Sequence, residues 1–335
     1  MDLLSQPSLE GVAVTAKAFV RDLADGQLVE SPFVVRDRTR REKRNGDPFL
    51  KLQLGDVTGV VEGVVWDGVD EAQAAAVPGA VVIVTGRYET RERYGGCLTV
   101  RSVREAPAGS YDLADLMDGP PQPFERMVAD LRALVETIRD ADLRALLDRF
   151  LAPDCELWQR WSEAPAAKTY HQAYRHGLLE HCLSVAQGVH TLSATFPGID
   201  HDLAVTGALL HDIGKVEAYA MNGSAIELTD AGKLLGEIPL GYYLVRREIE
   251  ELPGFAPDTA QALLHIILSH HGQLEHGSPV VPCTREATLV HMIDNLGGRL
   301  GSFDRIEKSL SNGERWSGFD RALSGSAYFA QRAAA

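Results

Sequence analysis

The sequence Leu-Leu-His-Asp-Ile-Gly-Lys at residues 209–215 joins an apolar run to two potential metal ligands, His211 and Asp212. Further ligand types occur later and earlier in the same half of the chain: His181 in Leu-Leu-Glu-His, the pair His270-His271, and Asp294 in Met-Ile-Asp-Asn-Leu. Imidazole and carboxylate are the ligands that borderline and hard divalent cations prefer. Unpaired polar side chains on apolar helices would be costly, and a shared metal would offset that cost. The combination predicts a helical unit built around a divalent metal.

Each of these residues also has a simpler interpretation. A lone histidine is more often a surface or core residue than a ligand, and we interpret the remaining histidines of this region in that way: His190, His201, His265, His276 and His291. Lys215 follows Asp212 by one helical turn. It is predicted to neutralise a phosphate oxygen in the transition state, and the alternative is a helix-end lysine favoured by the macrodipole.

The pattern of apolar residues divides the chain into a β part and a helical part, a multidomain α+β organisation. Residues 11–106 contain short runs rich in Val and aromatic residues, separated by Gly, Asp and Asn. They predict strands at 11–20, 33–36, 49–54, 59–66, 80–88 and 97–103. Five or six such strands favour a five-stranded OB-like β-barrel over residues 1–106. An SH3-like barrel and a small sandwich remain alternative folds, because strand count does not determine topology.

Proline and glycine mark residues 107–123 as a linker. Helical spacing then begins near Phe124. It predicts an all-α domain over 124–335, with helices near 177–195, 201–213, 229–252, 257–271 and 284–300. The helical pair around 124–151 is either a dimer interface or packs on the helical core.

The charge distribution bears on nucleic-acid binding. The formal net charge of −14 argues against a nucleic-acid binder, but residues 1–110 carry 14 basic and 16 acidic residues, against 19 and 31 in the remainder. Six basic residues fall in a predicted loop of the barrel: Arg36, Arg38, Arg40, Arg41, Lys43 and Arg44. Phe33, Trp66 and Tyr94 are candidate base-stacking residues. The alternatives are a solvated loop and core aromatic residues.

Longer motifs around the predicted ligands resemble the YhaM-type 3′-to-5′ exoribonucleases of the HD superfamily. The matching segments are Tyr-His-Gln-Ala-Tyr-Arg-His-Gly-Leu-Leu-Glu-His (170–181), Leu-Leu-His-Asp-Ile-Gly-Lys (209–215), Leu-Leu-Gly-Glu-Ile-Pro-Leu-Gly (234–241), Ile-Leu-Ser-His-His-Gly (267–272), Gly-Ser-Pro (277–279) and Ile-Asp-Asn-Leu (293–296). The resemblance covers nearly the whole chain and is strongest over 165–300. It implies an N-terminal OB-fold followed by a C-terminal HD domain of metal-dependent phosphohydrolases.

The resemblance also implies an activity and a ligand set. The family trims single-stranded RNA, and often DNA, from the 3′ end and releases nucleoside monophosphates. Its pattern implies one metal site formed by His181, His211, Asp212 and Asp294. Asp212 would bridge to a second ion held by His270, with His271 as a further candidate. The implied cofactor is Mn²⁺, with Mg²⁺, Fe²⁺ or Co²⁺ as alternatives and one or two ions per chain.

The chain departs from the family pattern at three positions. Glu237 stands where the family usually has His, Gln172 where it has the second residue of a His pair, and Gly297 where it tends to have Asp. Glu237 either ligates the second ion or leaves a single-metal enzyme. Among the remaining residues, whichever of His270 and His271 does not ligate is a candidate acid. His171 and Tyr174 are candidate nucleic-acid contacts.

Two other functions compete with an exonuclease: an HD phosphohydrolase acting on a free nucleotide (a dNTP, a cyclic dinucleotide or an alarmone), and a non-catalytic nucleic-acid binder with a structural metal. The predicted barrel argues against the first, because a small substrate needs no strand guide. The full ligand set with Lys215 argues against the second. We predict a cytoplasmic protein without membrane contact, because the four cysteines form no C-x-x-C pair and the sequence shows no signal peptide and no long apolar run. A homo-oligomer is compatible with the sequence.

Overall fold

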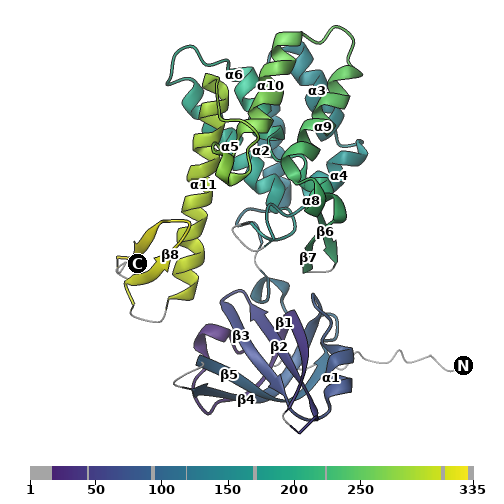
Figure 1. Ribbon diagram of the computed structural model, residues 1–335, viewed down its shortest axis with the longest axis vertical. Coiled ribbons are helices and arrows are strands. Elements are labelled where there is room, and N and C mark those ends of the chain that lie inside the picture. Colours follow the sequence, from purple (N-terminus) through teal and green to yellow (C-terminus); the bar gives the residue numbers. More distant parts are fainter. Residues whose placement is uncertain are drawn as a thin grey trace, which may run out of the picture. The chain divides into compact units, whose positions relative to one another are not determined.

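A computed structural model of the chain describes residues 17–43, 45–91, 95–117, 119–168, 172–222, 225–310 and 314–330 (Figure 1). The chain divides into two compact units, residues 1–117 and residues 118–335. Strands dominate the first unit and helices the second. Among the described residues, no helix combines the length and the apolar character that crossing a membrane requires.

Five strands of the first unit form a closed barrel in the order β1-β2-β3-β5-β4. They are β1 (Leu28–Glu42), β2 (Pro48–Asp56), β3 (Gly59–Val65), β4 (Val81–Arg91) and β5 (Gly95–Glu105). All neighbours pair antiparallel except β3 and β5, which pair parallel. Helix α1 (Val69–Ala75) connects β3 to β4, and two 3₁₀ turns, η1 (Val20–Asp22) and η2 (Leu113–Asp115), flank the barrel sequence. This five-stranded Greek-key barrel is the expected OB-fold.

Strand β1 corrects two predictions. It runs from Leu28 to Glu42 and so contains most of the basic segment that was predicted as a loop; the β1–β2 connection is only residues 43–47. The charged half of β1 stays extended because it pairs with β2, where Arg38 lies opposite Leu52 and Arg40 opposite Leu50. The predicted strand at 11–20 is also not supported: 11–16 lie outside the described residues, and 17–20 form no strand.

The second unit contains ten helices in the described part of the chain. They are α2 (Phe124–Glu136), α3 (Ala141–Leu151), α4 (Glu156–Glu163), α5 (Gly177–Ser193), α6 (His201–Leu210), α7 (Lys215–Ala218), α8 (Asp230–Leu234), α9 (Glu237–Glu250), α10 (Pro257–Ser269) and α11 (Arg285–Ser309), with the 3₁₀ turn η3 (Leu274–His276). Helices α2 and α3 pack on the common core through buried residues such as Leu131 and Leu147. The pair at 124–151 is therefore part of the helical core.

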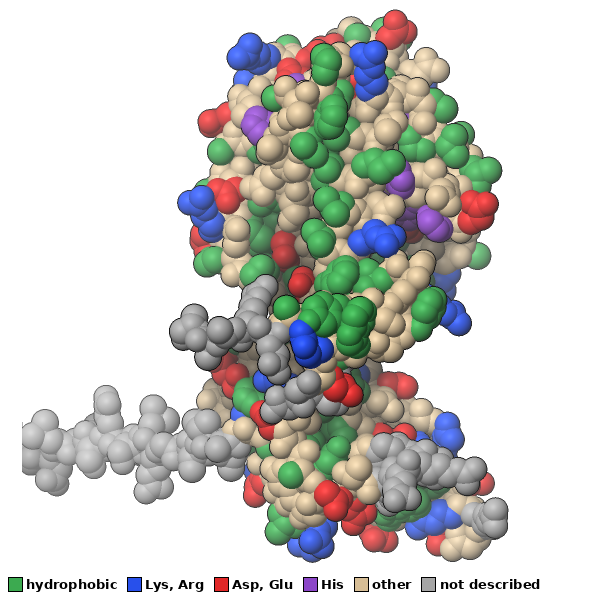
Figure 2. Space-filling model, turned by 90° about the vertical axis from the view of Figure 1, so that its left-hand side faces the viewer, with side chains coloured by type: hydrophobic (Ala, Val, Ile, Leu, Met, Phe, Trp, Pro, Cys, Tyr) green, Lys and Arg blue, Asp and Glu red, His purple; other side chains and the backbone are tan. Residues whose placement is uncertain are grey.

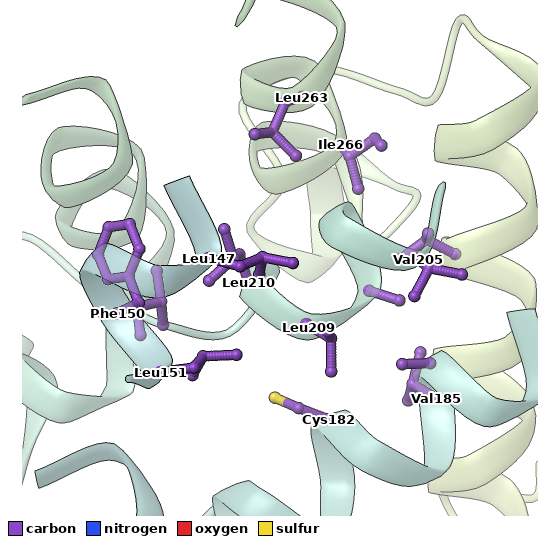
Figure 3. Close-up of a cluster of buried hydrophobic side chains, with 14 of the residues drawn as sticks. Leu147, Phe150, Leu151, Cys182, Val185, Val205, Leu209, Leu210, Leu263 and Ile266 are labelled. Atoms are coloured by element: carbon purple, nitrogen blue, oxygen red, sulfur yellow. The ribbon is translucent and has the colours of Figure 1, made fainter. Parts of the chain in front are cut away.

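Helix α6 lies at the centre of this core. Every residue from Leu203 to Leu210 is buried, and its side chains meet those of α3, α5 and α10 (Figure 3). Because α6 is apolar all round, it is enclosed by other helices rather than lying at the surface. Its C-terminal end therefore delivers His211 and Asp212 to the interior of the unit.

The second unit differs from the prediction in three places. The helix predicted at 229–252 is two helices, α8 and α9, separated at Gly236, whose φ of 78° favours glycine. Helix α11 continues to Ser309 instead of ending near residue 300. Two short antiparallel hairpins, β6 (Tyr219–Asn222) with β7 (Ala225–Leu228) and β8 (Trp316–Asp320) with β9 (Gly325–Tyr328), interrupt what was expected to be entirely helical.

Candidate metal centre

Four helices bring the predicted ligands together inside the second unit. Helix α5 carries His181, the end of α6 leads into His211 and Asp212, the end of α10 leads into His270 and His271, and α11 carries Asp294. His181, His211, Asp212 and His270 are each at most 5% exposed. Residues separated by more than 110 positions in the sequence thus share one buried cluster.

Asp212 is the central residue of the cluster. Its Oδ2 lies 3.2 Å from Nε2 of His181 and 3.4 Å from Nε2 of His211. Its Oδ1 lies 3.4 Å from Nε2 of His270. Asp294 Oδ1 is 3.2 Å from His181 Nε2 and 4.0 Å from His211 Nε2. Asp212 therefore has one oxygen toward each of two histidine groups, an arrangement that allows it to bridge two ions.

The histidines of the cluster are held in one tautomer. Their Nδ1 atoms lie within hydrogen-bond distance of oxygen acceptors: His211 of the Ala208 carbonyl (2.7 Å), His270 of the Ile267 carbonyl (2.7 Å), His271 of the His276 carbonyl (2.9 Å) and His181 of Gln172 Oε1 (3.1 Å). A carbonyl oxygen only accepts, so each Nδ1 carries the proton. The Nε2 atoms are left to face the carboxylates, and this orientation is usual for metal-ligating histidine.

The charges of the cluster are strongly coupled. Burial opposes ionisation of Asp212, but the charge of Lys215 and the contacts of His211 and His181 hold the pKa of Asp212 well below its usual value. Burial alone would lower the pKa of His181, yet its hydrogen bonds to Asp212 and Asp294 outweigh burial and raise that pKa to about 9.

The donor set fits a divalent cation. Asp212 Oδ1 and His270 Nε2 are buried without a hydrogen-bond partner, although buried polar atoms are normally paired. A cation between them would satisfy both. Three groups of three ligand atoms, each within 4.8 Å of one another, surround this space, and all combine imidazole nitrogen with carboxylate oxygen. The arrangement suits borderline or hard divalent cations.

Lys215 and Glu237 approach the centre from the neighbouring turn and helix. Lys215 Nζ lies 2.5 Å from Asp212 Oδ2, and Glu237 Oε1, at the first residue of α9, is 3.9 Å from His271 Nε2. Gly214 makes this approach possible: a Cβ there would lie 2.0 Å from the Glu237 carbonyl oxygen and 2.4 Å from the nitrogen of Gly241. The glycine thus allows α9 to contact the turn that follows Asp212.

His291 was not among the predicted site residues. Its Nδ1–H donates to the His270 carbonyl (2.7 Å). Its ring also packs so closely on Gly272 that a Cβ there would lie 2.1 Å from it. A possible signal was the position of His291 one helical turn before Asp294, on the same apolar segment. We interpret His291 as a positioning residue for His270.

Replacing His291 with Ala should therefore weaken metal binding without removing a ligand. Loss of a partner that orients a ligand typically lowers metal affinity by about 10–100-fold. Because His291 holds the main chain of His270 and not its ring, we expect a loss at the lower end of that range. Calorimetric titration with Mn²⁺ measures the change. His291→Asn, whose amide can still donate a hydrogen bond, should recover part of it. Thr288→Ala, one turn earlier on α11 and exposed, is the control. Equal affinities for His291→Ala and the wild type would contradict the assignment.

The predicted nucleic-acid contacts separate into two groups in the barrel. Arg38 bonds to the carbonyl oxygens of Gln73 and Ala76 at the end of α1, and Arg40 pairs with Asp70 on α1 at 2.6 Å. These two arginines support the barrel. Arg36 and Arg41 are exposed.

On the outer face, Trp66 is 39% exposed and stacks on Phe49 with ring centroids 5.0 Å apart. Lys43 Nζ lies 5.5 Å from the Trp66 ring centroid. Arg41 lies opposite Phe49 in the strand ladder, which places both side chains on this face. We call Arg41, Lys43, Phe49 and Trp66 the barrel patch.

The structure corrects one of the predicted base-stacking residues, and three of the predicted nucleic-acid contacts lie outside the described residues. Phe33 is fully buried in the barrel core and offers no surface to a base. Arg44, Tyr94 and His171 lie outside the described residues. The Tyr174 hydroxyl donates to Glu180 Oε2 at 2.7 Å, within the second unit.

Comparisons with known proteins find relatives over most of the chain. Residues 178–298 match the HD domain family. The chain is 32% identical over 292 residues to the 3′-5′ exoribonuclease YhaM of Geobacillus sp. (strain WCH70), covering 86% of this chain and 88% of that protein. It is 29% identical to the 3′-5′ exoribonuclease YhaM of Bacillus subtilis (strain 168), covering 86% and 90%.

Two solved structures resemble about a quarter of the chain. One is the second OB-fold domain of replication protein A from Methanococcus maripaludis, with a TM-score of 0.23, 16% identity and coverage of 27% of this chain and 94% of that one. The other is a small single-stranded DNA-binding protein from Streptomyces coelicolor, with a TM-score of 0.21, 16% identity and coverage of 25% and 98%.

Proposed function

The chain belongs to the YhaM family of 3′-5′ exoribonucleases, and on this premise we propose that it hydrolyses single-stranded RNA from the 3′ end to nucleoside monophosphates. The observation that carries the proposal is the buried cluster in which Asp212 Oδ1 and His270 Nε2 have no hydrogen-bond partner. Such a cluster of imidazole and carboxylate groups serves metal-assisted phosphodiester hydrolysis. Single-stranded DNA is a further substrate in the proposal.

The cluster divides naturally into two ligand groups around Asp212. His181, His211, Asp212 and Asp294 would hold one cation, and the second oxygen of Asp212 with His270 and His271 would hold another. Glu237, beside His271, supplies a carboxylate to the second group. We propose Mn²⁺, since it accepts both imidazole and carboxylate. When bound, such cations lower the pKa of water and stabilise the charge of a phosphate under attack.

The protein's own side chains have two tasks in this reaction. Lys215 is 13% exposed and lies beside Asp212, so its ammonium group can neutralise a phosphate oxygen as charge develops. His271 is 27% exposed. Its Nδ1–H donates to the His276 carbonyl, so Nε2 of the neutral ring is an acceptor. If His271 does not ligate, Nε2 can take up the proton that the attacking water loses and pass it to the departing 3′ oxygen. Burial and the charge of His270 lower the pKa of His271, which favours proton release.

We propose that the barrel patch guides the single strand. A stacked aromatic pair with basic neighbours is the arrangement by which OB-folds hold bases and backbone without reading sequence. The OB-fold commonly binds oligonucleotides on the face of its second and third strands and on the β1–β2 loop. Phe49 belongs to β2, Trp66 follows β3, and Lys43 begins the β1–β2 connection.

A time course on 5′-labelled single-stranded RNA with Mn²⁺ tests the activity. We expect a ladder that shortens from the 3′ end and stops when a chelator is added. The same protein is incubated with dNTPs and cyclic dinucleotides. Intact RNA together with hydrolysed free nucleotide would replace the proposed polymer substrate with a small one. Intact RNA and intact nucleotides in metal-replete protein would overturn the enzymatic proposal.

Replacing Trp66 with Ala should weaken binding of a single-stranded oligonucleotide. Stacking of one base contributes about 1–3 kcal/mol, so we expect roughly 5- to 100-fold weaker binding. Fluorescence anisotropy in the presence of a chelator measures affinity without hydrolysis. Val60→Ala, on β3 and 55% exposed, is the matched control. An affinity of Trp66→Ala within twofold of the wild type would remove Trp66 from the proposed strand path.

A further inference from the structure

Helix α11 exposes a stripe of large apolar side chains. Met292 is 58% exposed, Leu296 51%, Leu300 55% and Phe303 37%. Their spacing of four, four and three residues places them along one side of the helix. Figure 2 shows hydrophobic side chains following one another down this face of the second unit. A contiguous apolar surface of this size commonly marks an interaction site.

The hairpin β8–β9 extends this apolar surface. Trp316 is 62% exposed, Phe319 73% and Tyr328 43%. The hairpin is attached to α11 by the Arg305–Asp320 ion pair (2.6 Å) and by the contact of the Phe303 and Phe329 rings, whose centroids are 6.2 Å apart. We call these seven side chains the α11 surface: Met292, Leu296, Leu300, Phe303, Trp316, Phe319 and Tyr328.

We propose that the α11 surface binds the same surface of a second copy of this chain. An antiparallel pair of α11 helices, related by a two-fold axis between residues 296 and 300, would place Leu296 of each copy against Leu300 of the other. Such a self-complementary contact is what a two-fold dimer requires. Gly297 lies on the flank of this stripe, and nothing in the described structure is within 4 Å of the position of a Cβ there.

The exposed apolar side chains supply much of the area that a stable contact requires. A standard interface buries about 800 Å² on each partner. A fully buried aromatic side chain contributes roughly 150–250 Å², and three of the seven residues are aromatic residues exposed by 43–73%. Together with Met292, the two leucines and Phe303, they supply a large part of that area.

The distribution of charge also favours a second copy at this surface. Residues 118–298 contain 13 Lys and Arg against 25 Asp and Glu, whereas residues 299–330 contain five against four. Two acidic proteins repel each other least where their charge is balanced. Residues 299–330, which carry five of the seven side chains of the α11 surface, meet this condition.

Single-stranded RNA is the competing occupant. The Arg315 guanidinium lies 4.9 Å from the Tyr328 ring centroid, and the Tyr328 ring is 4.9 Å from that of Trp316, so the hairpin alone could stack a base. The helix argues for protein instead. Met292, Leu296 and Leu300 are aliphatic and offer bases neither a flat ring nor a positive charge.

The oligomeric state of the full-length protein tests the proposal. Light scattering after size exclusion should give the wild type a mass of twice the 36.5 kDa chain, or a multiple of that dimer. The double variant Leu296→Glu/Leu300→Glu should show that mass reduced at least twofold. Phe196→Glu, in the α5–α6 connection and 53% exposed, is the matched control and should keep the wild-type mass. Circular dichroism establishes that each variant is folded.

A disulfide cross-link provides a second test that needs no charged substitution. Leu296→Cys/Leu300→Cys, in a chain with Cys155→Ser and Cys283→Ser, should form an intermolecular disulfide under mild oxidation, because the proposed axis sets residue 296 of each copy against residue 300 of the other. A wild-type protein that is monomeric, or a folded double variant that keeps its mass, would overturn the proposal. A double variant with unchanged mass but weakened binding of single-stranded RNA would also overturn it and assign the surface to RNA.

Discussion

Asp212→Asn should abolish metal-dependent hydrolysis of RNA. Asp212 contacts all three of His181, His211 and His270 through its two oxygens, so the neutral amide removes a ligand from both proposed cation sites at once. Loss of a mere orienting partner already costs about 10–100-fold in metal affinity or activity. The loss of Asp212 itself should therefore exceed about 100-fold in both properties. Calorimetric titration with Mn²⁺ and the RNA time course measure them.

The size of the side chain is unchanged in Asp212→Asn, so the variant should remain folded. Asp258→Asn, an exposed carboxylate in the first turn of α10, is the matched control and should retain affinity and activity. If Asp212→Asn kept its Mn²⁺ affinity and still shortened RNA, the proposed metal centre would be wrong. If it lost activity while keeping full Mn²⁺ affinity, Asp212 would act on the substrate rather than on the cation.

Gly214→Ala should both destabilise the helical unit and reduce activity. The added Cβ would lie 2.0 Å from the Glu237 carbonyl oxygen, a backbone atom that cannot rotate away. The start of α9 must then move from the turn that carries Asp212 and Lys215. Overpacking of this kind typically costs about 1–3 kcal/mol. We expect a loss in the free energy of unfolding at the upper end of that range, measured by urea denaturation.

The activity of Gly214→Ala separates packing from chemistry. Displacement of Glu237 should weaken the second cation group more than the first, so activity should fall further than the loss of folded protein accounts for. Gly119→Ala, where nothing lies within 4 Å of the added Cβ, is the control and should match the wild type. Unchanged stability in Gly214→Ala would mean that α9 does not depend on close contact at this turn.

The sequence alone sufficed to predict the order of the two units and the types of residue that the buried cluster brings together. These residues could be recognised locally, because polar pairs such as His211-Asp212 and His270-His271 stand out at the ends of strongly apolar helices. The number of short runs rich in Val and aromatic residues likewise predicted a small barrel. Glu237 was identified only by resemblance, since a single glutamate at a helix start carries no signal of its own. His291 had a weak signal in its spacing from Asp294 and was interpreted as an ordinary histidine.

Tertiary structure decided how those residues are used. The strand register of β1, not its composition, directs Arg38 and Arg40 to α1 and leaves Arg41 beside Phe49. Burial distinguishes Phe33 in the core from Trp66 on the surface, although both are aromatic residues of the same barrel. The packing of α5, α6 and α10 decides that one oxygen of Asp212 faces His181 and His211 while the other faces His270. Such distances are set by contacts between segments far apart in the chain, which no local pattern of residues encodes.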